Sequence, residues 1–124
     1  MIEYMRRICA GLDGRPLLLD KMQLQSFPLE IITTSSGLER LDLSHNFISV
    51  FPEGVSKLAS LKELLMTNNT LTDLSAALCK CTSLESIDLS NNAIETINPT
   101  IFKLTRLLHL VLNHNQIKVL PIDM

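Results

Sequence analysis

The chain has 124 residues, which is enough for one small domain and too few for two. Its 11 basic and 13 acidic residues give a formal net charge of -2, and the absence of any Lys/Arg run argues against binding to nucleic acid. Hydrophobic residues make up 46% of the chain, but only 4% are aromatic and Trp is absent, so any core must consist mainly of Leu and Ile. Such a core favours a domain built from thin stacked layers.

Residues 1–13 are predicted to form a capping helix over the first layer. Their apolar residues follow the three-and-four spacing of an amphipathic helix: Ile2, Met5, Ile8, Cys9 and Leu12. Charges at Glu3, Arg6 and Arg7 interrupt what would be the apolar region of a signal peptide, and no apolar run approaches the ~20 residues of a membrane span. The sequence therefore predicts a soluble, cytoplasmic chain.

From residue 38 onward the sequence repeats every 23 residues. The copies are "LERLDLSHNFI" from Leu38, "LKELLMTNNTL" from Leu61, "LESIDLSNNAI" from Leu84 and "LLHLVLNHNQI" from Leu107. A weaker copy, "LLLDKMQLQSFP" from Leu17, matches the second copy at an offset of 24. The array at 14–124 therefore divides into units one to five, at 14–37, 38–60, 61–83, 84–106 and 107–124, of which the last is incomplete.

The pattern LxxLxLxxNxL resembles the leucine-rich repeat. The Phe-Pro pairs at 27–28 and 51–52 and the Leu-Pro pair at 120–121 are similar to those of the intracellular, Ras-suppressor-like subclass with its 23-residue repeat. Met22 departs from the pattern by replacing Asn in unit one, and Leu74-Ser75 and Ile97-Asn98 replace the Leu-Pro pair in units three and four. The resemblance implies an α/β solenoid, a right-handed superhelix with a parallel sheet of short strands on its concave face.

The spacing has a physical reason of its own. Leu41 and Leu43 are two residues apart on a short strand, so both point inward, while Phe51, Val55 and Leu58 supply inward contacts from the returning arc. A turn with one buried side cannot hold itself together alone, so neighbouring turns must bury each other's faces.

One asparagine recurs at the bend after each strand of units two to five, at Asn46, Asn69, Asn92 and Asn115. Backbone groups at this bend point inward without sheet partners, and leaving one unpaired costs about 1 to 3 kcal/mol. An amide side chain both donates and accepts. We therefore interpret these residues as a structural asparagine ladder.

The C-terminal segment "LPIDM" stops about ten residues before the arcs of the preceding units end. The sequence is therefore interpreted either as a fragment of a longer protein or as an array whose open edge pairs with another chain.

Histidines and cysteines are the candidates for chemistry. His45 and His114 are equivalent residues of units two and five, about 14 Å apart at the usual strand spacing, which is too far for one shared metal ion. Cys81 aligns with core leucines, and Cys79 is expected on the convex side without an activating base. We therefore predict no metal site, no cofactor and no catalytic activity.

Lysines recur 23 residues apart at Lys57, Lys80 and Lys103. They are expected either to form a basic column for an acidic partner or anionic lipid, or to cap the carbonyl ends of short helical turns on the convex side. The second interpretation is favoured.

The outward positions of the strands and bends form the predicted partner-binding surface. Phe47, Leu65 and Val111 are apolar where the scaffold requires no apolar residue, which is typical of a binding patch inside a polar rim; scattered surface hydrophobes are the alternative. The predicted set is Arg40, Asp42, His45, Phe47, Glu63, Leu65, Asn68, Asp88, Asn91, His109, Val111 and His114. Unit one adds Leu18, Asp20 and Lys21, and Ser44 is also placed outward.

Three functions are compatible with this sequence. The first is a protein-interaction module that binds a partner across its concave sheet, where the resemblance implies scaffolding in intracellular signalling around a small GTPase or a phosphatase. The second is the N-terminal recognition segment of a larger enzyme such as a ligase or kinase. The third is a structural unit that self-associates through its open C-terminal edge.

Overall fold

A computed structural model of the chain describes residues 16–34 and 37–118. The predicted capping helix at 1–13, Cys9 and the segment at 120–124 lie outside the described residues. Within the described ranges, no helix is long and apolar enough to cross a membrane.

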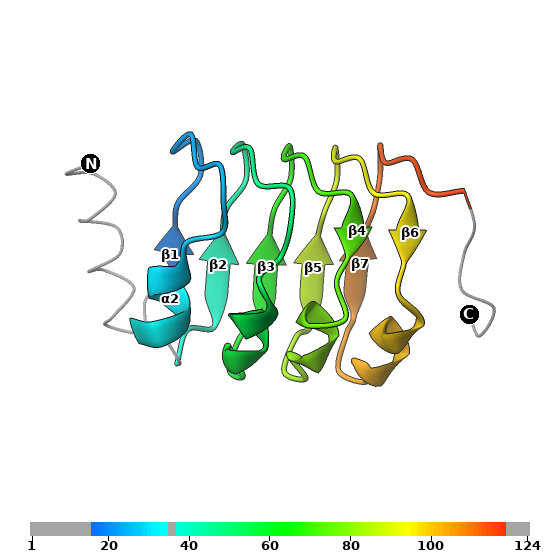
Figure 1. The fold of residues 1–124 in the computed structure, drawn as a ribbon. Helices are drawn as coiled ribbons and strands as arrows, with labels where there is room; N and C mark the ends of the chain where they lie inside the picture. The colour runs from blue at the N-terminus through cyan, green and yellow to red at the C-terminus, as the bar shows by residue number, and fades with distance from the viewer. Residues whose placement is uncertain (1–15, 35–36, 119–124) are drawn as a thin grey trace.

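Five short strands form one parallel sheet in which each unit contributes one strand (Figure 1). In sheet order they are β1 (Leu17–Leu18), β2 (Arg40–Asp42), β3 (Glu63–Leu65), β5 (Ser86–Asp88) and β7 (His109–Val111). Sheet order follows chain order, as a stack of successive turns requires. The repeat spacing therefore translates directly into strand spacing.

The middle residue of each strand points into the core. Leu41, Leu64 and Ile87 are paired in register and are at most 1% exposed, whereas Leu110 in the last strand is only half-buried. Side chains alternate across a strand, so the residues on either side of each of these positions point away from the core. A fully buried leucine contributes about 1.5 to 3 kcal/mol, and every turn supplies several.

The return segments close each turn with a short helix. Unit one uses α2 (Leu29–Thr34), and the next three units use the 3₁₀ helices η1 (Glu53–Lys57), η2 (Leu78–Lys80) and η3 (Pro99–Lys103). Figure 1 shows these helices stacked along the array, away from the five-stranded sheet. The three 3₁₀ helices end on Lys57, Lys80 and Lys103, which are exposed, so the lysines occupy the helix ends that the second interpretation gave them.

A second, two-stranded parallel sheet was not predicted from the sequence. It pairs β4 (Asp73–Leu74) with β6 (Thr96–Ile97), and both strands lie in front of the main sheet in Figure 1. These strands belong to the two units in which Ser75 and Asn98 stand where unit two has Pro52. Proline has no backbone N–H to donate to a neighbouring strand, so its replacement leaves these segments free to pair.

One sequence expectation about burial was wrong. Ser44, placed outward, is only 6% exposed because it sits at the bend between neighbouring turns. Cys79 lies in η2 of a return segment, on the side expected for it, and is only 2% exposed because η2 packs against η3 of the next turn. Cys81 is fully buried, as predicted for a core residue.

The asparagine side chains join each turn to the preceding one. Asn69 Oδ1 accepts the Ile48 N–H at 3.0 Å, and Asn69 Nδ2 donates to the Leu43 carbonyl at 3.0 Å. The same two bonds to the previous turn are made by Asn92 and Asn115. Each amide therefore satisfies a donor and an acceptor that the sheet leaves unpaired.

Asn46 makes an additional bond that compensates for Met22, which replaces the asparagine of unit one. Its Oδ1 accepts both the Met22 N–H at 3.0 Å and the Leu24 N–H at 2.9 Å, while its Nδ2 donates to the Leu19 carbonyl at 3.0 Å. The degenerate first unit is therefore held by the side chain of the second.

Substituting Asn69 by Ala is expected to lower the free energy of unfolding by at least about 2 kcal/mol, because a buried donor and a buried acceptor lose their partner together. Chemical denaturation measures this change. Asn115→Ala should lower it less, since Asn115 is half-exposed and water can replace the amide. Asn68→Gly is the control, because Asn68 is exposed and its φ of 56° is one that glycine adopts freely. Equal stability of Asn69→Ala and the parent would contradict the structural role.

Candidate functional site

The exposed side of the five-stranded sheet, here called the sheet face, arranges the repeat positions in rows across the strands. One row begins at the strand starts and runs Arg40, Glu63, Ser86 and His109. The row at the strand ends, here called the alternating column, runs Leu18, Asp42, Leu65, Asp88 and Val111. The register thus brings together seven of the twelve predicted partner-binding residues: Arg40, Asp42, Glu63, Leu65, Asp88, His109 and Val111.

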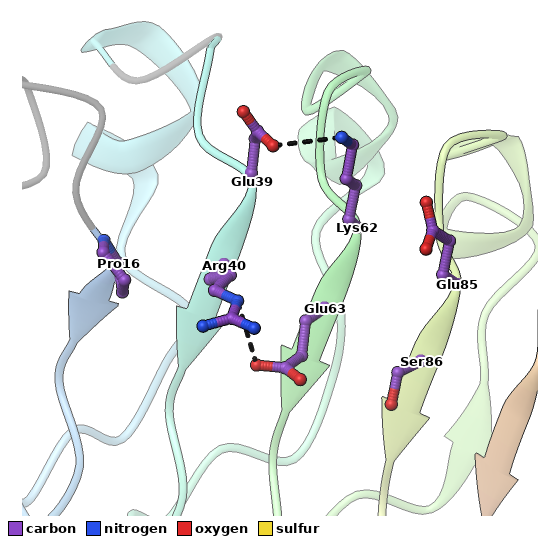
Figure 2. A pocket seen from close by; sticks show the side chains of 7 residues that line it. All are labelled: Pro16, Glu39, Arg40, Lys62, Glu63, Glu85 and Ser86. Carbon is purple, nitrogen blue, oxygen red and sulfur yellow. Dashed lines mark ion pairs between the residues drawn. The ribbon is translucent and has the colours of Figure 1, made fainter.

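Two adjoining hollows lie over the N-terminal half of the sheet face. The larger, of about 370 Å³, is shown in Figure 2 and is lined by Pro16, Glu39, Arg40, Lys62, Glu63, Glu85 and Ser86. The smaller, of about 250 Å³, is lined by Pro16, Leu18, Arg40, Leu41, Asp42, Glu63 and Leu65. Because the two share Pro16, Arg40 and Glu63, they form one depression with a charged half and an apolar half.

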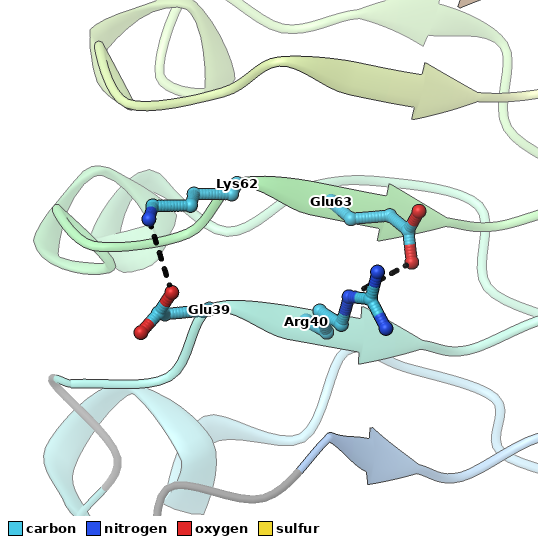
Figure 3. Close-up of polar contacts among 4 residues, drawn as sticks. All are labelled: Glu39, Arg40, Lys62 and Glu63. Carbon is cyan, nitrogen blue, oxygen red and sulfur yellow. Dashed lines mark ion pairs between the residues drawn. The ribbon is translucent and has the colours of Figure 1, made fainter.

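Ion pairs cross from β2 to β3 in the charged half (Figure 3). Arg40 Nε lies 3.6 Å from Glu63 Oε1, and Lys62 Nζ lies 3.2 Å from Glu39 Oε1. All four side chains are at least one-third exposed, so each pair contributes at most about 1 kcal/mol. The pairs set the charge pattern of the face more than they stabilise the fold.

Asp42 and Asp88 have a role in the scaffold besides their exposed position. Asp42 Oδ1 accepts the Ser44 N–H at 2.9 Å, and Asp88 Oδ1 accepts the Ser90 N–H at 3.0 Å and the Ser90 hydroxyl at 2.6 Å. Each carboxylate thus pairs the backbone donor two residues further on, a common role for Asp at a bend. Within the described ranges neither carboxylate forms an ion pair.

Leu65 is an apolar residue between two acidic neighbours in this column. It stands where units two and four have aspartate, so the Thr67 N–H has no side-chain acceptor in its own unit. That N–H donates instead to Ser44 Oγ of the preceding turn, at 3.2 Å. An apolar side chain on the sheet face is therefore possible here because a neighbouring hydroxyl takes over the backbone bond.

Four of the predicted partner-binding residues occupy a left-handed bend. The φ angles of His45, Asn68, Asn91 and His114 lie between 56° and 58°, and all four side chains are exposed. Asn and His adopt this conformation more readily than most residues, so backbone geometry explains their identity at these positions. Their exposure leaves contact with a partner possible but does not require it.

Phe47 lies apart from the hollows. It is 58% exposed on the bend that follows β2, where its N–H donates to the Leu24 carbonyl at 2.7 Å. It lines neither hollow, and its equivalents in the next turns are Thr70 and Ala93. The structure therefore separates this predicted anchor from Leu65.

Three charged lining residues were missed by the sequence analysis, as was Pro16. Glu39, Lys62 and Glu85 each immediately precede a strand, and Figure 2 shows them at the edge of the hollow on three successive turns. Their charges alternate along the array. The signal that identifies them is the second position of LxxLxLxxNxL, which the predicted surface did not include.

The described residues contain no group of three or more His, Cys, Asp or Glu side chains that could hold a metal ion. Both described thiols are buried, and burial raises the pKa of Cys79 and raises the pKa of Cys81 from 9.0 to about 11. Cys81 Sγ donates to the Val55 carbonyl at 3.2 Å. These are protonated core thiols rather than nucleophiles.

Comparison with known families identifies the repeats. A model described as "Leucine rich repeat" matches residues 15–71, and one described as "Leucine Rich repeats (2 copies)" matches residues 59–103. Together they span four of the five units. The chain is therefore a leucine-rich repeat domain, a class that typically serves as a non-catalytic protein-interaction module.

Solved structures agree on the fold. A leucine-rich repeat protein of Leptospira interrogans superposes with a TM-score of 0.76 at 23% identity, over 94% of this chain and 36% of that chain. A second similar structure is the ectodomain of the Arabidopsis thaliana membrane receptor kinase GASSHO1/SCHENGEN3, solved in complex with CASPARIAN STRIP INTEGRITY FACTOR 2. It gives a TM-score of 0.65 at 40% identity, over 73% of this chain and 11% of that chain. The chain therefore spans about a third or less of these relatives.

One curated protein shares local sequence identity. The probable serine/threonine-protein kinase roco11 of Dictyostelium discoideum is 43% identical over 51 residues, which is 41% of this chain and 3% of the kinase. The aligned part is therefore a small fraction of that kinase.

Substituting Ser44 by Ala is expected to lower the free energy of unfolding by about 1 kcal/mol, because the Thr67 N–H loses its acceptor. In the Leu65→Asp background the same substitution should be nearly neutral, since the new carboxylate supplies the bond that Asp42 and Asp88 make in their units. A double-mutant cycle by urea denaturation measures this coupling. If the two substitutions changed the free energy of unfolding additively, the carboxylate introduced by Leu65→Asp would not replace Ser44 as the acceptor of the Thr67 N–H.

The Cys9→Ser variant is expected to react with a thiol reagent only after unfolding, because Cys79 and Cys81 are buried and protonated. Their native pKa values exceed those of the unfolded chain, so stability is retained below about pH 9 and lost as the pH rises toward about 11. Reaction with an aromatic disulfide reagent at pH 8, with and without denaturant, measures accessibility. Rapid labelling of the native variant would contradict this account.

Proposed function

We propose that this domain is a non-catalytic protein-interaction module that binds a protein partner through the sheet face. The observation that carries the proposal is Leu65, an apolar residue where the neighbouring units place an acid, set in a hollow with Leu18. The scaffold gains nothing from this leucine, because Ser44 must then supply the missing backbone acceptor. Binding to an apolar group of a partner explains why it is present.

The charged half of the hollow is proposed as the polar rim. Arg40 and Glu63 border the apolar half, Lys62 and Glu39 lie in the charged half beside it, and the four give orientation more than affinity. Of the remaining predicted residues, Asp88, His109 and Val111 extend the same face, and His45, Asn68, Asn91, His114 and Phe47 are proposed as contacts along its bend.

The 23-residue period and the Phe-Pro pairs support the Ras-suppressor-like subclass, in which the domain acts as a scaffold or regulator of intracellular signalling. The resemblance implies a small GTPase or a phosphatase as the partner class. One similar structure is the ectodomain of a membrane receptor kinase, so the fold itself assigns no compartment, and the cytoplasmic location stays a prediction from the sequence.

A second function is that of a recognition segment within a larger enzyme. It is supported by the local identity to the probable kinase roco11, of which the aligned part is a small fraction. Recognition through the sheet face is common to both functions, so the same substitution tests both. Self-association through the C-terminal edge stays a prediction, because residues 119–124 lie outside the described ranges.

Substituting Leu65 by Asp is expected to reduce capture of a partner by at least about tenfold while lowering stability by no more than about 1 kcal/mol, because the new carboxylate lies between Asp42 and Asp88. A charge would replace the apolar contact, while the scaffold would gain the bond made by Asp42 in unit two. The measurement is quantitative affinity capture from cell extract together with thermal denaturation.

Val50→Asp is the matched control. Val50 is 61% exposed, and the equivalent residue of unit three is already Asp73, so the same change is made away from the sheet face. Loss of partners in both variants, or in neither, would contradict the proposed site.

A further inference from the structure

The sheet face is more acidic than the chain as a whole. Its hollows and alternating column carry five carboxylates, from Glu39, Asp42, Glu63, Glu85 and Asp88, against the two cations Arg40 and Lys62. This gives a formal local charge of -3, compared with -2 for the entire chain when histidine is left out of both counts. A partner that covers this face must supply positive charge, because burying unpaired carboxylates is unfavourable.

Apolar and acidic residues alternate rung by rung in the alternating column. Leu18 pairs in register with Asp42, Asp42 with Leu65, Leu65 with Asp88, and Asp88 with Val111. Leu18 is 53% exposed, and the other four side chains are half-buried, so all five are accessible. The apolar members are therefore separated by two rungs, which is about 9.6 Å at the usual strand spacing.

This spacing fits an α-helix lying across the strands. Residues seven apart on a helix are separated by about 10.5 Å, and a residue three or four positions along lies between them on the same face. Leu18 and Val111 are four rungs apart, about 19 Å, and fourteen helical residues span about 21 Å. An extended segment fits less well, because its same-side residues are about 6.7 Å apart.

Resting on the proposed function, we propose that the partner presents a basic amphipathic helix to the alternating column. Its apolar residues recur every seventh position and contact Leu18, Leu65 and Val111. Lysines or arginines between them pair with the carboxylates of Asp42 and Asp88. The Oδ1 atom of each carboxylate is already bonded to the backbone, which holds the group in place for the incoming cation.

Binding of a designed peptide to the full 124-residue chain tests this proposal directly. The probe is an alanine-based helix with leucine at every seventh residue and lysine three residues after each leucine. The control peptide has the same composition, with the lysines moved to the opposite side of the helix. Fluorescence anisotropy is expected to show tighter binding of the first peptide, and binding that weakens as salt rises from about 0.05 to about 0.5 M.

The double variant Asp42→Asn and Asp88→Asn removes the charge while retaining the Oδ1 acceptor for Ser44 and Ser90. It should keep the thermal stability of the parent and bind the first peptide about two- to thirtyfold more weakly, as expected for two exposed charge pairs. Asp73→Asn is the matched control, because Asp73 is an exposed residue of β4 in the second sheet. This variant should bind the first peptide as the parent does.

Equal affinity for the two peptides, or unchanged affinity of the double variant, would overturn the basic helix. The proposed function is judged separately by capture with the Leu65→Asp variant. Reduced capture by that variant together with equal peptide affinities would leave the interaction site in place and remove only the helix. If the Leu65→Asp variant captured partners as the parent does and neither peptide bound, both the proposed interaction site and the proposed basic helix would be overturned.

Discussion

The side-chain amide of one asparagine in each of units two to five is the interaction on which this domain depends. Where each strand ends, the chain must turn inward and expose backbone groups that the sheet cannot pair. Asn46, Asn69, Asn92 and Asn115 each bond groups of two successive turns, so the repeats are joined by buried polar contacts as well as by leucine packing. Without these bonds the bends would leave unsatisfied groups in every turn.

The same bend determines which positions are available for recognition. Backbone geometry selects the left-handed residue that precedes each ladder asparagine. It also selects Asp42 and Asp88, because each accepts the backbone N–H of the serine two residues further on. Leu65 departs from that selection, and Ser44 compensates for it. A surface residue that the scaffold does not explain is better evidence for binding than one whose identity the backbone already requires.

Much of the fold could be predicted because the repeat period fixes the strand register. Leu41 and Leu43 were assigned to the core from spacing alone and are buried, and the leucine-rich repeats are confirmed. The second sheet and the burial of Cys79 were missed, since both arise from contacts between return arcs that have no strict period. The hollow was found only in part, because Glu39 and Lys62 precede the strands and their pairing needs the three-dimensional register.

We propose that the alternating column, rather than the return arcs, is the binding surface. Backbone amide shifts of the labelled chain during titration with the leucine-and-lysine helix distinguish these two surfaces. We predict the largest changes at Leu18, Asp42, Leu65, Asp88 and Val111, with little change in β4 and β6. Changes centred on β4 and β6, with the column unaffected, would contradict it.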